Sequence, residues 1–215
     1  MEKLLDEIES YWSTRTEGYS EVNHKELAGT QKNAWLKVLT SQFPDKPKEE
    51  IRILDIGTGP GFFPVILAEA GYHVDAVDYT EGMLEKAKEN AGDFCRNIRF
   101  WRMDAQKLDF EDNTFDVVIS RNLTWNLEHP DVAYREWVRV LKAGGKLLNF
   151  DANWYGYLYE EEQRKAYEND RKNVENNSLD DHYLCTDIER MERIALQVPL
   201  SKIRRPQWDV KTLRE

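Results

Sequence analysis

The stretch IRILDIGTGPGF, from Ile51 to Phe62, constrains the fold more than any other part of the chain. An apolar run rich in β-branched residues ends in Asp55, and glycines at 57, 59 and 61 precede an apolar helical pattern. Glycine allows positive φ and close approach of a ligand, and the free N–H groups at a helix start can donate to that ligand. The stretch therefore predicts a strand, a tight turn and a helix that together hold a nucleotide-like molecule.

The residues after this turn alternate between strand and helix patterns. We expect strands at 51–56, 73–77, 97–101, 115–120 and 145–150, and helices near 60–70, 80–91 and 130–142. Alternation with short connections predicts a parallel sheet covered by helices on both faces. The predicted fold class is α/β, with a Rossmann-like, doubly wound sheet of five parallel strands.

Three parts follow one another within a single predicted domain: residues 1–48 as N-terminal helices and lid, 49–151 as the ligand-binding core, and 152–215 as a helical cap region. Helical spacing of apolar residues predicts helices at about 3–12 and 24–42. Between them, residues 11–19 are rich in Tyr, Trp and Arg, so we expect a loop that covers the ligand. Packing of Tyr11 and Trp12 on the core is the alternative.

Composition limits the partners and the compartment. The net charge of −10 repels polyanions, so neither a nucleic acid nor an anionic membrane surface is expected as a partner. Cys95 and Cys185 form no C-x-x-C pair, and no cluster of His, Asp and Glu has metal-ligand spacing, so no metal is expected. Without a signal peptide or an apolar run of 18 residues, we expect a cytoplasmic protein, either a monomer or a homodimer.

Two aspartates follow the next two predicted strands. Asp78 lies 21 residues after Gly57, where a carboxylate can accept hydrogen bonds from both hydroxyls of a ribose. Asp104 lies after the third strand in FWRMDAQKLDF. Alone, Asp104 would more simply be a loop or cap residue.

Taken in order, these motifs resemble those of the class I S-adenosylmethionine-dependent methyltransferases. The turn reads G-x-G-x-G, because residue 62 is Phe and the dinucleotide pattern G-x-G-x-x-G is not met. Residues 115–120 resemble the family's fourth-strand motif, and residues 140–145 resemble V-L-K-P-G-G with Ala143 in place of proline. The resemblance covers about residues 50–151 and is closest to the small-molecule, type 11-like branch.

The resemblance implies S-adenosyl-L-methionine as cofactor and methyl transfer to a small molecule, with O, N or S as acceptor atom undetermined. Asp104 would bind the adenine amino group, and Asp55 with Gly57 would hold the methionine end. For each position, turn geometry or core packing is the alternative. The implied cofactor-binding residues are Asp55, Gly57, Thr58, Gly59, Gly61, Asp78, Tyr79, Met83, Asp104, Ala105, Ser120 and Arg121.

No catalytic base is assigned, because a methyl displacement needs one only when the acceptor must lose a proton. Ligands bind beyond the carboxyl ends of parallel strands, so the candidates are Asp151, Asn153, His129, Arg121 and Tyr19. His129 is alternatively a plain loop residue and Arg121 a structural ion pair. Asp151 and Asn153 could equally serve orientation alone.

Two rival functions remain open: an RNA or protein methyltransferase on the same fold, or a cofactor-binding protein that no longer catalyses. The family's sheet normally ends in an antiparallel hairpin, but the region after 150 shows no pair of alternating strand patterns. We therefore expect the hairpin to be missing and the strand at 146–150 to lie at an edge. The appended helices or another subunit would cover that edge, or the chain is a truncated form of a longer protein.

Overall fold

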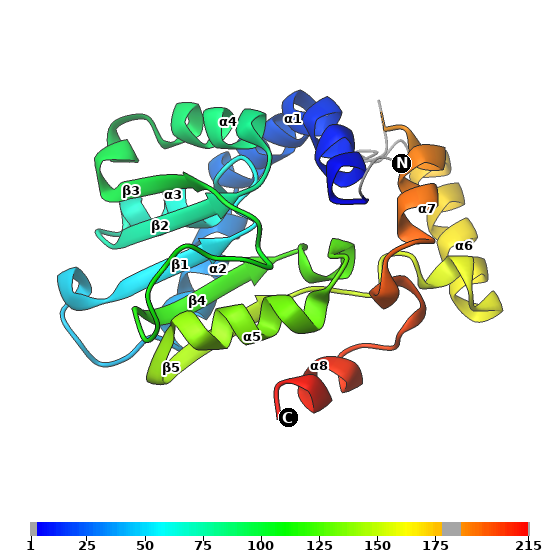
Figure 1. Ribbon diagram of the computed structural model, residues 1–215. Helices are drawn as coiled ribbons and strands as arrows, with labels where there is room; N and C mark the ends of the chain where they lie inside the picture. Colours follow the sequence, from blue (N-terminus) through cyan, green and yellow to red (C-terminus); the bar gives the residue numbers. More distant parts are fainter. Residues whose placement is uncertain (1–3, 178–185, 215) are drawn as a thin grey trace.

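The computed structural model describes residues 4–177 and 186–214 and is built on a parallel sheet (Figure 1). The strands are β1 (Arg52–Ile56), β2 (His73–Asp78), β3 (Ile98–Arg102), β4 (Phe115–Arg121) and β5 (Leu141–Phe150). All neighbouring strands pair in parallel, in the order β3-β2-β1-β4-β5. The predicted Rossmann-like sheet of five parallel strands is confirmed, with β5 at one edge.

The order of the strands reverses between β1 and β4, which creates a crevice at their carboxyl ends where α/β proteins bind ligands. The helices are α1 (Leu4–Ala28), α2 (Gln31–Thr40), α3 (Phe62–Glu69), α4 (Glu81–Ala91), α5 (Pro130–Val140), α6 (Glu161–Asn177), α7 (Ile188–Ala195) and α8 (Gln207–Thr212). Short 3₁₀ turns are η1 (Lys48–Glu50), η2 (Gly92–Asn97), η3 (Thr124–Asn126), η4 (Gly156–Leu158) and η5 (Pro199–Lys202).

Side chains of alternate strand residues build a core on each face of the sheet. Ile53 and Ile119 pack with α2 and α3 on one face. Leu54 and Val118 pack with α5 on the other, where Trp137 is completely buried. Strands covered on both faces read as continuous apolar runs, and these runs located the strands in the sequence.

The N-terminal region differs from the expectation. Residues 11–19 lie inside the single helix α1, so the predicted lid loop between two helices is wrong. The buried face of α1 is largely polar, and a search for apolar spacing therefore missed this part of the helix. Its buried polar residues are Arg15, Thr16, Ser20 and Asn23.

The C-terminal end of α5 also differs. The helix ends at Val140 instead of near residue 142, and β5 begins at Leu141 instead of residue 145, so the pair Gly144-Gly145 lies within the strand. The pairing register of β4 and β5 shifts between Phe115 and Val117. A Cβ on Gly145 would lie 2.9 Å from the carbonyl oxygen of Asp116, so the close strand contact explains this glycine.

After β5 the described residues are helical or irregular, and none of them forms a sixth or seventh strand. Residues 178–185, with Cys185 among them, lie outside the described part of the chain. Trp208 of α8 stacks on Tyr134 of α5 at 5.7 Å between ring centroids, so the C-terminal segment packs beside β5. Within 4–177 and 186–214, no helix has the length and apolar character needed to cross a membrane.

Candidate active site

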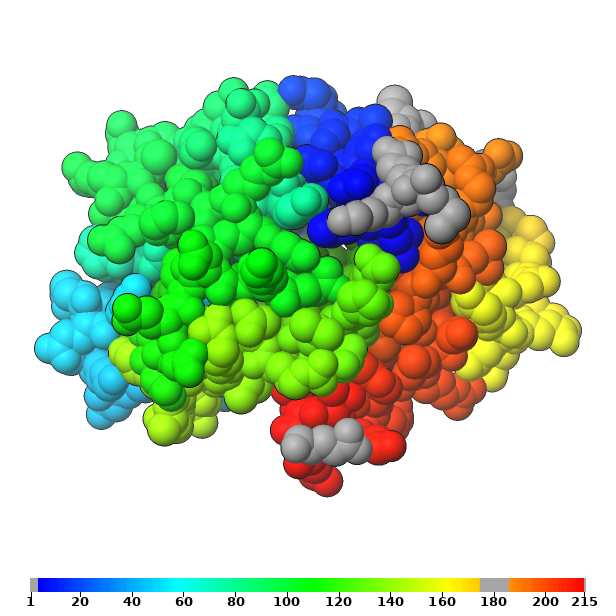
Figure 2. Space-filling model, in the orientation of Figure 1, coloured from blue at the N-terminus to red at the C-terminus, as the bar shows by residue number. Residues whose placement is uncertain are grey.

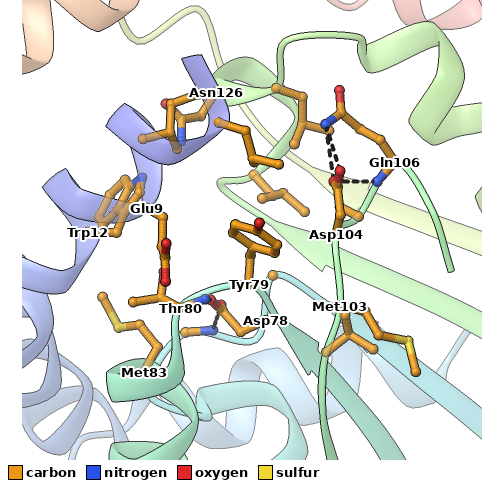
Figure 3. A pocket seen from close by; sticks show the side chains of 18 of the residues that line it. Glu9, Trp12, Asp78, Tyr79, Thr80, Met83, Met103, Asp104, Gln106 and Asn126 are labelled. Carbon is orange, nitrogen blue, oxygen red and sulfur yellow. Dashed lines mark hydrogen bonds between the residues drawn. The ribbon is translucent and has the colours of Figure 1, made fainter. Parts of the chain in front are cut away.

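A cavity lies at the carboxyl ends of β1, β2 and β4. Helix α1 covers the side of this cavity that faces away from the sheet. Figure 2 shows α1 (blue) between the green part of the core, which includes α4, and the orange α7. An ion pair of 2.8 Å between Glu9 of α1 and Arg102 of β3 joins the helix to the far wall. In Figure 3, Glu9 and Trp12 lie across the cavity from Asp104 and Gln106. Of the residues implied for cofactor binding, the cavity is lined by Gly57, Gly59, Asp78, Tyr79, Met83, Asp104, Ala105 and Arg121.

The glycine turn forms the floor of this cavity. Gly57 has a φ of +70°, and its N–H donates to the carbonyl oxygen of Val77 at 2.8 Å. A Cβ on Gly57 would lie 2.7 Å from Cδ2 of Leu123, which no side chain tolerates without displacement of its neighbour. The sequence needs glycine here both for the left-handed conformation and for the close approach.

Asp78 lies at the end of β2, and its carboxylate keeps free hydrogen-bond acceptor sites. Its two carboxylate oxygens accept the N–H groups of Gly59 at 2.8 Å and Thr80 at 2.9 Å. Burial raises the pKa of Asp78, although these N–H groups act in the opposite direction. Because an ionised carboxylate offers about four acceptor sites, about two remain for a ligand with paired hydroxyls.

Asp104 is held by a residue that the sequence analysis missed. Its Oδ1 accepts both the backbone N–H of Gln106, at 2.9 Å, and the side-chain Nε2, at 3.1 Å. Oε1 of Gln106 accepts the backbone N–H of His129 at 2.6 Å. Gln106 thus ties the loop after β3 to the start of α5, while the exposed ring of His129 stays outside the lining. In the sequence, the only local indication of this contact is that Gln106 follows Asp104 by two residues.

Four implied cofactor residues support the turn from beneath instead of lining the cavity. Asp55 is 2% exposed, and its Oδ2 accepts the hydroxyl of Thr58 at 2.6 Å. Burial raises the pKa of Asp55 to about 7. The hydroxyl of Ser120 donates to the carbonyl oxygen of Ile56 at 3.0 Å. Gly61, at the start of α3, packs on Ala87 of α4.

Arg121 lines the cavity, but its guanidinium is engaged by α1. It donates to both carboxylate oxygens of Glu26, at 2.6 and 3.0 Å, and lies 5.1 Å from the ring centroid of Trp35. The bidentate pair matches the structural alternative for Arg121. Tyr19, which precedes Glu26 on the same helix, also lines the cavity, and burial raises the pKa of its phenol.

Asp151 and Asn153 do not line the cavity. Oδ2 of Asp151 accepts the backbone N–H of Trp125 at 2.9 Å and pairs with the guanidinium of Arg205 at 2.7 Å. Oδ1 of Asn153 accepts the backbone N–H of Arg205 at 3.2 Å. Both residues anchor the C-terminal segment at the end of β5, so the structure does not bring these two candidates to the glycine turn.

Asn126 of η3 is a second residue that the sequence analysis did not single out. It lines the cavity, is 3% exposed, and its Oδ1 has no hydrogen-bond partner within the described chain. A buried acceptor without a partner is costly and points to a ligand that donates to it.

Comparison with known proteins assigns the core of the chain to a family. Residues 54–149 match the family model described as a methyltransferase domain. This stretch belongs to the methyltransferase family. The match confirms the resemblance to the S-adenosylmethionine-dependent enzymes that the motifs indicated.

Relatives of the methyltransferase domain include proteins named as demethylmenaquinone and ubiquinone biosynthesis methyltransferases. The chain is 32% identical to the demethylmenaquinone methyltransferase of Renibacterium salmoninarum, over 69% of this chain and 60% of the relative. It is 29% identical to the ubiquinone biosynthesis O-methyltransferase of Coxiella burnetii, over 58% of this chain and 53% of the relative. The chain spans 39–60% of the length of the curated relatives that it matches first.

A solved structure extends the likeness to the fold of nearly the whole chain. A proposed S-adenosyl-L-methionine-dependent methyltransferase from Methanococcus maripaludis matches with a TM-score of 0.59, over 85% of this chain and 82% of that chain. The sequences are 22% identical, so this comparison shows the shared fold.

The cavity fits the family's cofactor in three respects. Gly57 and Gly59 line the cavity with backbone alone, Asp78 keeps about two acceptor sites, and Asn126 has a buried oxygen without a partner in the described chain. S-adenosyl-L-methionine carries the hydroxyl and amino donors that such acceptors need. The methyltransferase domain therefore holds a cofactor site at the switch point of its sheet.

Proposed function

We propose that this protein transfers the methyl group of S-adenosyl-L-methionine to a small-molecule acceptor. The observation that carries the proposal is the cavity in which the glycine turn, Asp78 and Asp104 meet beneath α1. When bound, the cofactor supplies a methyl group on a positively charged sulfur. A nucleophile on the acceptor would form a bond to that methyl carbon as the carbon–sulfur bond breaks, and the sulfur would leave as a neutral thioether.

The protein's own part is to bind, to orient and to exclude water. Asp78 accepts the ribose hydroxyls, Asp104 accepts the adenine amino group, and the turn at Gly57 and Gly59 admits the methionine end. Helix α1 shelters the cofactor from solvent, which an open edge of strand ends would not do. Alignment of donor and acceptor in such a site can supply a rate gain without a dedicated base.

A small-molecule acceptor is supported by the names of the curated relatives, a demethylmenaquinone methyltransferase and a ubiquinone biosynthesis O-methyltransferase. The acidic chain is a poor match for RNA, since phosphate contacts require lysine and arginine. A cytoplasmic location, the absence of a metal, and a monomeric or homodimeric state remain predictions from the sequence.

The first test measures cofactor binding by calorimetry with S-adenosylhomocysteine. Asp78→Ala removes one or two charge-assisted hydrogen bonds worth roughly 1.5–3 kcal/mol each, so we expect affinity to fall by at least about tenfold. Asp109→Ala is the matched control, because Asp109 is exposed and lies outside the cavity. Unchanged affinity of the Asp78 variant would refute the ribose assignment.

The second test follows a labelled methyl group from S-adenosyl-L-methionine into three acceptor pools: small metabolites, RNA and protein. The proposal expects label in the small-metabolite pool. Label in RNA or protein identifies the corresponding rival activity. Tight cofactor binding without transfer to any of the pools would instead indicate a binding protein that does not catalyse.

A further inference from the structure

A second cavity lies next to the cofactor cavity and shares part of its wall. Trp12, Tyr19 and Asn122 line both cavities, so the two spaces meet at these side chains. The second cavity extends from there towards residues 186–191, which lead into and begin α7. A ligand in it would therefore lie beside the cofactor and not beneath it.

Aromatic rings dominate the walls of the second cavity. Trp12 and Tyr19 of α1 meet edge to face at 5.6 Å between centroids. Trp125 and Tyr155, from the segments after β4 and β5, lie 5.0 Å apart with ring planes tilted by 31°. The six aromatic residues of this lining are Tyr11, Trp12, Tyr19, Trp125, Trp154 and Tyr155.

The junction between the two cavities is built around a residue in an uncommon backbone conformation. Asn122 has a φ of +56°, in the left-handed region that residues other than glycine rarely adopt. Its N–H donates to the carbonyl oxygen of Phe150 at 2.9 Å, and its own carbonyl oxygen accepts Nε1 of Trp125 at 3.0 Å. Asparagine adopts this conformation more readily than most residues, and here it turns the chain after β4 so that the carbonyl of Asn122 holds the ring of Trp125.

The charge of the lining distinguishes between two kinds of ligand that aromatic walls can bind, an ammonium group and a flat ring. Among the described residues of this lining, Arg15 is the one with a basic or acidic side chain of the Arg, Lys, Asp or Glu type, and it is 8% exposed. No carboxylate belongs to the described lining. An aromatic cage can hold an ammonium group, but this described lining would place that group beside the guanidinium of Arg15 and offers it no carboxylate. A flat ring stacks on aromatic faces without needing a counter-charge.

We propose that the second cavity binds the methyl acceptor, and that this acceptor presents a flat aromatic ring without a positive charge. The inference rests on the proposed function, since it places the acceptor beside the bound cofactor. Trp12 and Tyr19 hold the ring at the junction, and Trp125 with Tyr155 forms the deeper wall. Trp154, which is 46% exposed, forms the rim.

The test uses the full chain saturated with S-adenosylhomocysteine and three bicyclic probes of similar size. The probes are 2-naphthol, its saturated analogue decahydro-2-naphthol, and the cationic 2-naphthylmethylamine at pH 7. Calorimetry should show 2-naphthol binding at least about tenfold more tightly than either of the others, because aromatic pairs attract beyond area burial and the amine meets a like charge.

Trp154→Leu removes one ring at the exposed rim and should weaken 2-naphthol binding several-fold without changing the affinity for S-adenosylhomocysteine. Trp101→Leu is the matched control, since Trp101 is an exposed tryptophan on β3 that lines neither cavity. It should alter neither affinity.

Three results would overturn this inference while the proposed function stands: no probe binding by a protein that binds S-adenosylhomocysteine, equal binding of the aromatic and saturated probes, or tighter binding of the amine. Unchanged 2-naphthol affinity in Trp154→Leu would also show that Trp154 does not belong to the acceptor site. Failure of the wild-type protein to bind S-adenosylhomocysteine would instead contradict the proposed function.

Discussion

Replacing Asp55 by asparagine should make the protein's stability less dependent on pH. The carboxyl group of Asp55 is buried beneath the glycine turn and accepts the hydroxyl of Thr58. The substituted asparagine would keep the size of the side chain and an oxygen that can accept this bond, but it cannot ionise. The comparison therefore isolates the charge of a buried acid whose pKa burial raises to about 7.

The sign and size of the effect follow from the two pKa values. In the unfolded chain the carboxyl titrates near 3.8, and in the folded protein near 7. Between these values the folded state binds more protons than the unfolded state, so stability falls as pH rises. Between pH 5 and pH 8, the proton difference persists over roughly two pH units, up to the folded-state pKa. At about 1.36 kcal/mol per unit, the free energy of unfolding falls by about 2–3 kcal/mol.

Urea denaturation of both proteins at pH 5, 6, 7 and 8 measures the effect. The free energy of unfolding of Asp55→Asn minus that of the wild type should increase by about 2–3 kcal/mol across this range. Asp109→Asn, at an exposed carboxyl, controls for general loss of negative charge. A difference that stays constant from pH 5 to pH 8 would show that Asp55 is already ionised in the folded protein and refute the reasoning.

Three further outcomes are expected. Asp104→Ala should weaken S-adenosylhomocysteine binding less than Asp78→Ala and relax discrimination against an analogue without the adenine amino group; unaltered discrimination in calorimetry would refute that role. Gly57→Ala should lower both the melting temperature and cofactor affinity, because its Cβ would lie 2.7 Å from Leu123; an unchanged melting temperature contradicts this. Burial raises the pKa of Asp116, but Lys142 and Lys46 and a backbone N–H outweigh it and hold the pKa at about 2. Asp116→Asn should therefore destabilise the protein above about pH 4, and the loss should shrink as pH falls towards 2, as urea titrations at pH 7 and pH 3 can check.

Local patterns in the sequence were sufficient to predict the sheet, and most of the residues predicted to bind the cofactor line the cavity. The glycine turn and Asp78 could be predicted because each lies at the end of an apolar run that forms a strand. In a parallel sheet the carboxyl ends of the strands meet at one edge, so residues far apart in the chain are brought together by topology alone. The five parallel strands, with β5 at the edge, follow from the same alternation of strand and helix.

Tertiary contacts decided what these patterns could not. The path of α1 was missed because its buried face is polar and satisfied by contacts with α4, such as that between Asn90 and Ser20. Asp151 directly follows a strand, as a catalytic candidate would, yet Arg205 pairs with it from a distant part of the chain. The aromatic cavity joins Trp12 to Trp125 and Tyr155, which are far from it in the sequence. These residues share no short sequence pattern, so only the packing of the folded chain brings them together.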